Sequence, residues 1–348
     1  MVNDSADYSG VHMATPDLGH KQELGIEMRE LHIPVSLAPG EPTEHEVYAE
    51  LCVPADGAPT VVQVLLHGAI YNGTYWDFPY QPERYSYVDH MVSRGYATLN
   101  VDRIGNGRST RPHSTRVDLD SNAFVIHQLV TALRDGSLGR PFERVVLAGH
   151  SYGTLVASRA AAVHGDVDAL ILTSALHTTS PAGAAAMGGN IAAYAASQEP
   201  KFAHLDDGYK TSKPGTRAEM LYLAENADPA VIALDEELKE TVSFSEMAHL
   251  ERWQTDDTTR GVAVPTLVAV GDHDIVWCGP DAVDCSTAES VRAAEAKYYA
   301  PEAQLEVFVL RDSGHDLNLQ LNSDVWFAAA TDWLAARART WAPASEAH

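Results

Sequence analysis

The stretch Val145-Val146-Leu147-Ala148-Gly149-His150-Ser151-Tyr152-Gly153 decides the fold of this chain. Its apolar first half is typical of a buried strand, and the run Thr154-Leu155-Val156-Ala157 that follows is typical of a helix. A serine at such a strand-to-helix turn adopts a strained backbone conformation that lifts its hydroxyl clear of the sheet edge. Only very small residues two positions before and after it let strand and helix approach. Gly149 and Gly153 meet that demand, which makes Ser151 a candidate nucleophile.

Two later apolar runs end in the groups that a serine nucleophile needs. Residues 265–270 lead into Gly271-Asp272-His273-Asp274, and residues 305–310 lead into Asp312-Ser313-Gly314-His315. The serine needs an imidazole base, and a carboxylate must hold that base in the right tautomer. Of the 16 histidines, only His315 follows the last predicted strand in a glycine-preceded loop. Asp272 and Asp274 share one loop, and both are candidate acids.

Two earlier strands also end in glycine-containing turns. Residues 61–66 lead into His67-Gly68-Ala69-Ile70, and residues 97–101 lead into a turn at 102–109. A backbone N–H of the first turn can point at an oxyanion from the side opposite Ser151. We therefore predict an oxyanion hole formed by the N–H groups of Tyr152 and Ala69.

With four such motifs in this order, the chain resembles the α/β-hydrolase superfamily over roughly residues 45–178 and 258–338. The resemblance implies an α/β fold with a mostly parallel eight-stranded sheet, helices on both faces, and a mainly helical cap inserted after the sixth strand. It places the nucleophile on Ser151, the base on His315 and the acid on Asp274, the fourth position counting from Gly271. Asp272 then braces the loop. A serine nucleophile excludes the epoxide hydrolases and haloalkane dehalogenases of this fold, which use an aspartate.

The composition favours a globular protein with a small-molecule substrate. The chain has 348 residues, of which 45% are hydrophobic and 21% charged. Its formal charge of −24 argues against nucleic acid or an anionic membrane as a partner. The amino terminus has neither a basic start nor an apolar core, and no apolar stretch is long enough to span a membrane. We expect a cytoplasmic location, and a homodimer is left open.

The cysteine and histidine spacing bears on redox state and metals. Cys278 and Cys285 flank a Gly-Pro turn in the loop after Asp274, whereas Cys52 lies in a predicted strand. A short-range disulfide between the first two is left open, with reduced thiols the default in the cytoplasm. No tight Cys/His/Asp cluster has metal-ligand spacing, and no phosphate-binding glycine loop follows the first strand. We expect no metal and no cofactor.

The pattern of predicted strands and helices divides the chain into three parts. Residues 1–25 lack periodicity and are expected to form a loose N-terminal arm. Residues 26–178 and 258–348 form the α/β core, beginning with two antiparallel strands at 28–37 and 45–53. Residues 179–257 form the cap, with helices and no further buried strand. Helices of the core are predicted at residues 85–94, 121–135, 154–163 and 323–340.

Four residues are candidates for substrate binding, although packing in the core or on the surface explains such side chains at least as well, and better for a cap residue such as Met187. They are Ile70, Tyr75, Trp76 and Met187.

These features predict a serine hydrolase that cleaves a small or medium ester or lactone through an acyl-enzyme. The same residues could instead serve C–C bond hydrolysis, lyase chemistry or acyl transfer. A third reading is a ligand-binding protein that keeps the fold without the reaction, as some hormone receptors do.

Overall fold

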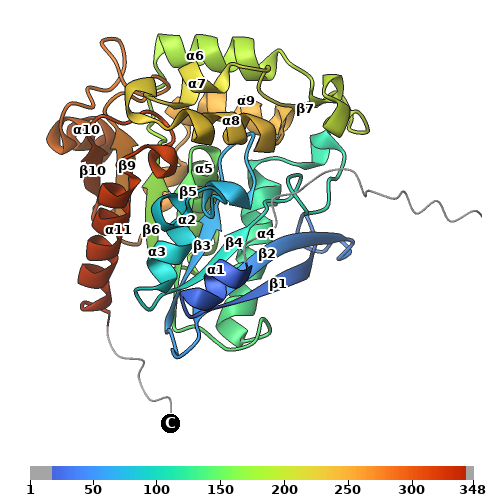
Figure 1. Ribbon diagram of the computed structural model, residues 1–348, viewed down its shortest axis with the longest axis vertical. Coiled ribbons are helices and arrows are strands. Elements are labelled where there is room, and N and C mark those ends of the chain that lie inside the picture. The colour runs from blue at the N-terminus through green and yellow to red at the C-terminus, as the bar shows by residue number, and fades with distance from the viewer. Residues whose placement is uncertain (1–17, 342–348) are drawn as a thin grey trace, which may run out of the picture.

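The computed structural model describes residues 18–341, and their centre is one eight-stranded sheet (Figure 1). The strand order is β1-β2-β4-β3-β5-β6-β9-β10. The strands β1 and β2 pair antiparallel, as do β2 and β4, and every other neighbouring pair in this sheet is parallel. The bounds are β1 (Ile26–Val35), β2 (His45–Pro54), β3 (Val61–Leu66), β4 (Ala97–Val101), β5 (Arg144–His150), β6 (Ala169–Thr173), β9 (Thr266–Gly271) and β10 (Glu306–Leu310).

Helices cover both faces of the sheet, as predicted. On one face, α4 (Leu119–Asp135), α5 (Tyr152–His164) and α10 (Ala288–Glu295) contribute to one apolar core. On the other face, α3 (Tyr87–Val92) and α11 (Ser323–Ala338) contribute to a second. Parallel strands covered on both sides need apolar residues at every position, which is why the central strands read as continuous apolar runs rather than alternating ones.

The cap is inserted between β6 and β9 and lies above the sheet in Figure 1. It is mainly helical, but the prediction that it holds no further buried strand is wrong. Tyr209 and Val242 are buried in a two-stranded antiparallel ribbon that sequence periodicity could not reveal, because each strand has two residues. The cap elements are α6 (Pro181–Met187), β7 (Tyr209–Lys210), α7 (Arg217–Leu221), α8 (Pro229–Leu238), β8 (Val242–Ser243) and α9 (Phe244–Arg252).

The predicted loose arm is wrong for its last part, and its residues 1–17 lie outside the described residues. Helix α1 (Leu18–Glu23) precedes β1, and Lys21 on this helix is only 3% exposed. Its ammonium pairs with the carboxylates of Asp77 and Asp89. These long-range ion pairs hold a helix that is too short to form by itself.

The helix predicted at residues 85–94 is shorter in the structure, where α3 spans Tyr87–Val92 and a separate short helix precedes it. Helix α2 (Pro82–Tyr85) ends at Ser86, and the Ser86 hydroxyl accepts a hydrogen bond from the Asp89 N–H to begin α3. Serine at this capping position satisfies an N–H that the helix itself leaves free. Within residues 18–341, no helix has the length and apolar character needed to cross a membrane.

Cys278 and Cys285 are joined by a disulfide, which the sequence left open, and Cys52 is a buried free thiol. The bridge closes the loop that follows β9. Disulfides persist mainly in oxidising compartments, so this bond fits poorly with the cytoplasmic location that we expect from the sequence.

Candidate active site

Ser151 occupies the turn between β5 and α5 in the strained conformation that the sequence predicts. Its φ of 51° and ψ of −118° lie in a region that residues with a side chain rarely adopt. A Cβ atom on Gly149 would lie 2.4 Å from the carbonyl oxygen of Gly153, and one on Gly153 would lie 2.1 Å from that of Leu66. Both positions therefore require glycine. Ser151 keeps part of its surface exposed.

His315 and Asp274 meet at the carboxyl ends of β10 and β9. The His315 Nδ1 and Asp274 Oδ2 atoms are 2.9 Å apart, and the other Asp274 oxygen accepts the Val276 N–H. The loops can approach because Gly271 has no Cβ, which would lie 2.2 Å from the carbonyl oxygen of Gly314. Burial lowers the pKa of His315, but the charge and hydrogen bond of Asp274 outweigh burial and raise this pKa above its usual value.

Of the two candidate acids, Asp274 contacts His315 and Asp272 does not. Asp272 accepts the Ser313 N–H at 3.2 Å and lies 2.8 Å from the Nδ1 of His273, so it braces the two loops against each other. In the described part of the chain, no hydrogen bond joins the Ser151 hydroxyl to His315. Such bonds are often long in unliganded enzymes and tighten when substrate binds.

The loop that should supply the second oxyanion donor lies directly against the nucleophile. A Cβ on Gly68 would lie 3.0 Å from the Cβ of Ser151. Ile70, at a φ of 59°, donates its N–H to the carbonyl oxygen of Thr241. Among the described residues, no acceptor is assigned to the N–H of Ala69 or of Tyr152. These two groups are therefore free to bind a substrate oxygen.

Buried Arg103, whose role the sequence did not reveal, fixes this loop. Its backbone N–H donates to His67 Nε2 at 3.0 Å, and its guanidinium donates to the His67 carbonyl oxygen at 3.0 Å. The Nδ1–H of His67 is then directed at the Gly68 carbonyl oxygen, 2.8 Å away. Glu246 on cap helix α9 pairs with the same guanidinium at 2.6 Å. The only sequence signal was the position of Arg103 in the turn that follows a strand.

The four candidate substrate-binding residues lie in different surroundings. Trp76 is fully buried and its ring contacts Tyr75 and Tyr87, so it packs in the core in this conformation. Tyr75 is also fully buried, and its ring stacks on His150 at a centroid distance of 3.9 Å. Ile70 is 1% exposed, whereas Met187 is half-buried. In this conformation only Met187 keeps appreciable surface.

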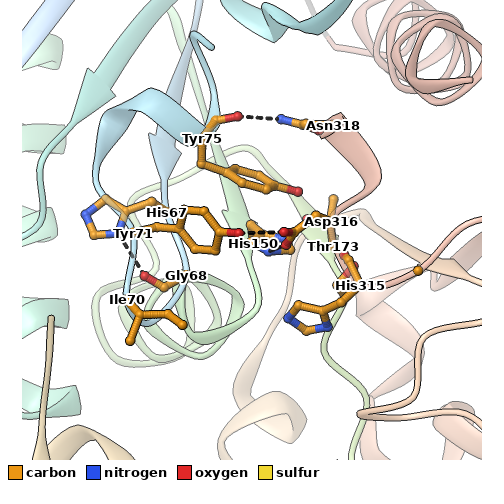
Figure 2. Close-up of polar contacts among 12 residues, drawn as sticks. His67, Gly68, Ile70, Tyr71, Tyr75, His150, Thr173, His315, Asp316 and Asn318 are labelled. Carbon is orange, nitrogen blue, oxygen red and sulfur yellow. Dashed lines mark hydrogen bonds and ion pairs between the residues drawn. The ribbon is translucent and has the colours of Figure 1, made fainter. Parts of the chain in front are cut away.

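A buried polar network lies behind His315 and was missed by sequence reasoning (Figure 2). The hydroxyl of Tyr71 contacts the carboxylates of Asp316 and, at 3.1 Å, Asp235. Burial, followed by the nearby charge of Asp235, raises the pKa of Asp316 to about 7. His150 lies beside Asp316, and burial followed by His315 lowers its pKa well below the usual value. No sequence spacing signals this network because its members come from segments far apart.

A family model described as the alpha/beta hydrolase family matches residues 63–330 of this sequence. The chain belongs to the alpha/beta hydrolase family. The match contains the turn at Ser151 and the loops of Asp274 and His315. A comparison of this alpha/beta hydrolase with curated proteins gave no match.

Solved structures agree with this alpha/beta hydrolase in fold. An enol-lactonase from Burkholderia xenovorans LB400 is 16% identical at a TM-score of 0.57, covering 87% of this chain and 100% of its own. An esterase from Exiguobacterium antarcticum is 18% identical at a TM-score of 0.57, with 84% and 96% covered. A bromoperoxidase from Bacillus anthracis is 15% identical at a TM-score of 0.56, with 88% and 100% covered. At such low identity the likeness shows the fold alone.

Proposed function

We propose that this protein hydrolyses a small or medium carboxylic ester or lactone through an acyl-enzyme on Ser151. The observation that carries the proposal is the 2.9 Å contact of His315 with Asp274 at the same sheet edge as the strained Ser151. A strained serine, an oriented base and free backbone donors together are the parts that acyl transfer requires.

In the first half-reaction, the Ser151 Oγ attacks the carbonyl carbon and its proton passes to His315. Because Nδ1 of His315 faces Asp274, the proton goes to Nε2. The N–H groups of Tyr152 and Ala69 stabilise the oxyanion of the tetrahedral intermediate. Collapse breaks the C–O bond to the leaving group, which takes the proton from His315. An ester releases an alcohol, whereas a lactone keeps its new hydroxyl on the acyl chain.

In the second half-reaction, His315 takes a proton from water, and the resulting attack releases the acid and restores Ser151. Both steps need an imidazolium beside Asp274. The raised pKa of His315 reports that the charged form is favoured there. Asp274 is fully buried and accepts the Val276 N–H, so its orientation toward His315 is fixed. The lactonase and the esterase of similar fold support ester or lactone as the substrate class.

The first test is labelling with a fluorophosphonate probe, followed by peptide mass spectrometry. We expect the wild type to carry the adduct on Ser151, and we expect labelling to fall at least 100-fold in His315→Ala. Asp274→Asn and Asp272→Asn form a matched pair from one loop. Labelling should fall sharply in the first and far less in the second. Equal losses, or an adduct on another residue, would contradict the assignment.

The second test is turnover of short-chain aryl esters and of lactones by wild type and Ser151→Ala. Hydrolysis should disappear in the variant while its unfolding temperature stays unchanged. An acyl adduct on Ser151, trapped by acid quench during turnover, would separate the acyl-enzyme route from lyase chemistry. Turnover that survives in Ser151→Ala would refute the mechanism. Tight ligand binding without any turnover would favour a binding protein.

A further inference from the structure

Two buried polar atoms behind the proposed catalytic base face each other without a hydrogen bond. The Nε2 of His150 and the Oδ1 of Asp316 are 3.3 Å apart, and both side chains are fully buried. Neither atom has a hydrogen-bond partner among the described residues. A buried donor or acceptor left without a partner costs about 1–3 kcal/mol, so such a pair calls for an explanation.

A third ligand atom is close to this pair. His150, His315 and Asp316 each offer one nitrogen or oxygen atom, and these atoms all lie within 4.8 Å of one another (Figure 2). Two ligands of a tetrahedral zinc ion at bond lengths of about 2.0–2.1 Å are about 3.3 Å apart. The His150–Asp316 separation of 3.3 Å already matches that edge. His315 would supply the third protein ligand.

The remaining polar atom of each candidate ligand is held by the protein. His315 contacts Asp274 through Nδ1 at 2.9 Å, and His150 contacts the Thr173 hydroxyl through Nδ1 at 3.1 Å. The other carboxylate oxygen of the third ligand accepts the hydroxyl of Tyr71. Metal-binding histidines and carboxylates usually have such outer partners, which fix the direction of the lone pair that binds the metal.

The charges around the three ligands favour a cation. Asp274, Asp316 and Asp235 bring three carboxylates to this network. Arg217 is the guanidinium in contact with it, and Asp235 binds Arg217 through two hydrogen bonds of 2.8 Å each. Among the described residues, no lysine or arginine forms an ion pair with Asp274 or Asp316, whose only ion-pair partners are histidines. Two imidazoles with one carboxylate are a ligand set that zinc prefers over magnesium or calcium.

We propose that His150, His315 and Asp316 form a binding site for Zn²⁺, and that the metal-bound protein is inactive as a hydrolase. Since Nδ1 of His315 contacts Asp274, Nε2 is the atom left for the metal. That same nitrogen must accept the Ser151 proton, so metal binding and catalysis exclude each other. The binding half of this proposal is independent of the proposed function, whereas the inhibition half rests on it.

Binding is tested by equilibrium dialysis of Zn²⁺ against the chelator-treated full-length protein. We expect one saturable Zn²⁺ site in the wild type and in Ser151→Ala. The affinity of this site for Zn²⁺ should fall at least 10-fold in Asp316→Asn and in His150→Gln. Asparagine keeps the shape of Asp316 and still offers Tyr71 an acceptor, and circular dichroism verifies that each variant is folded. Because the ligands are almost fully buried, dialysis has to run for hours. Co²⁺ absorption in the visible range then reports whether the site is tetrahedral.

A surface histidine pair supplies the matched control. The rings of His127 and His164 stack at 4.0 Å, and His127 Nδ1 lies 2.6 Å from Asp166, so this pair could also capture Zn²⁺. His164→Gln should leave the saturable site intact. If binding is lost in His164→Gln and kept in Asp316→Asn, or if the wild type has no saturable site, the proposal is overturned.

Inhibition is tested by the rate of fluorophosphonate labelling of the wild type with and without Zn²⁺. Labelling should slow at least 10-fold at saturation and recover with chelator, whereas Asp316→Asn should lose this zinc sensitivity. If the wild type does not label at all, the proposed function fails while the dialysis result on Ser151→Ala still decides the metal site. Zinc binding without any change in labelling would refute the inhibition.

Discussion

Arg217 of α7 and Asp235 of α8 form a bidentate ion pair inside the cap, with side-chain exposures of 0% and 2%. The Tyr71 ring lies 4.3 Å from the guanidinium carbon, so the pair joins the cap to the loop after β3. Removing one partner leaves the other charge buried and unpaired. This pair is therefore one of the contacts that hold the cap against the core, beside that of Arg103 with Glu246.

We predict that Asp235→Ala lowers the free energy of unfolding by about 3–5 kcal/mol, the usual cost of an unpaired buried charge. The double variant Arg217→Met/Asp235→Leu should lose far less, because it removes both charges. Urea denaturation gives the free energy of unfolding of the wild type, Asp235→Ala, the double variant, and its two single variants Arg217→Met and Asp235→Leu. A double variant as unstable as the sum of its single variants would show that the pair does not interact.

Lys21 should be essential to the packing of α1, because its ammonium faces the buried carboxylates of Asp77 and Asp89. We expect Lys21→Met to destabilise the protein by about 3–5 kcal/mol, again by leaving buried charge unpaired. Lys297→Met, at an exposed position, is the control and should change stability by less than about 1 kcal/mol. Equal effects in thermal unfolding would contradict the role of Lys21.

Glu50 should make stability fall as the pH rises. Burial, moderated by the hydrogen bond from Tyr48 and reinforced by Asp77 and Asp102, raises its pKa to about 7 from a usual 4.5. The folded state therefore holds a proton that the unfolded state has lost between these values, and this contribution to stability disappears as the pH rises through about 7.

The test compares Glu50→Gln with the wild type by urea denaturation at pH 5.5 and pH 8.5. Glutamine still accepts the Tyr48 hydroxyl, so the variant should gain about 2 kcal/mol relative to the wild type between the two pH values. Exposed Glu27→Gln is the control and should show no such gain. A constant difference at both pH values would mean that Glu50 does not titrate in this range.

Gly153→Ala should abolish fluorophosphonate labelling and destabilise the fold, because the new Cβ would lie 2.1 Å from the carbonyl oxygen of Leu66. We expect a loss of at least about 3 kcal/mol in the free energy of unfolding, as for other severe steric conflicts in a packed core. Gly188→Ala has no atom within 4 Å of its new Cβ and should keep both labelling and stability. Normal labelling of Gly153→Ala would contradict the close approach of β3 and α5.

The disulfide should stabilise the loop that carries Asp274, since the Cys278 N–H donates to the Asp274 carbonyl oxygen at 2.8 Å. Closing a loop with a sequence separation of 7 residues contributes about 2–2.5 kcal/mol in the chain-entropy model. We expect Cys278→Ser/Cys285→Ser to lose about that much. Cys52→Ser controls for the loss of a cysteine outside the disulfide. Reductant should lower the melting temperature of Cys52→Ser, which keeps the disulfide, and should leave that of the double variant unchanged. An unchanged melting temperature of the wild type under full reduction would refute the contribution.

The sequence could predict the structural features that depend on residues close together in the chain. The turn at Ser151 needs small residues two positions away on either side, and Gly149 and Gly153 reveal that requirement in the sequence. The apolar strands and the order of the motifs behind them carried the family resemblance, and that resemblance implied the eight-stranded sheet that the structure has. Boundaries were less certain where capping intervened, as at Ser86. The short helix α1 could not be predicted from its polar composition, because only Lys21 is buried and its ion-pair partners are distant in sequence.

Only the tertiary structure decided which distant side chains meet. The residue pattern alone offered both Asp272 and Asp274, and the family resemblance favoured Asp274. The fold brings Asp274, 41 positions before His315, into contact with it. It also places Asp316 beside His150 and Trp76 inside the core. The physical reason is that local sequence sets backbone conformation and burial, whereas contacts between charged and polar groups depend on how the strands are ordered in the sheet. The proposed nucleophile could be predicted from nine consecutive residues; its surroundings could not.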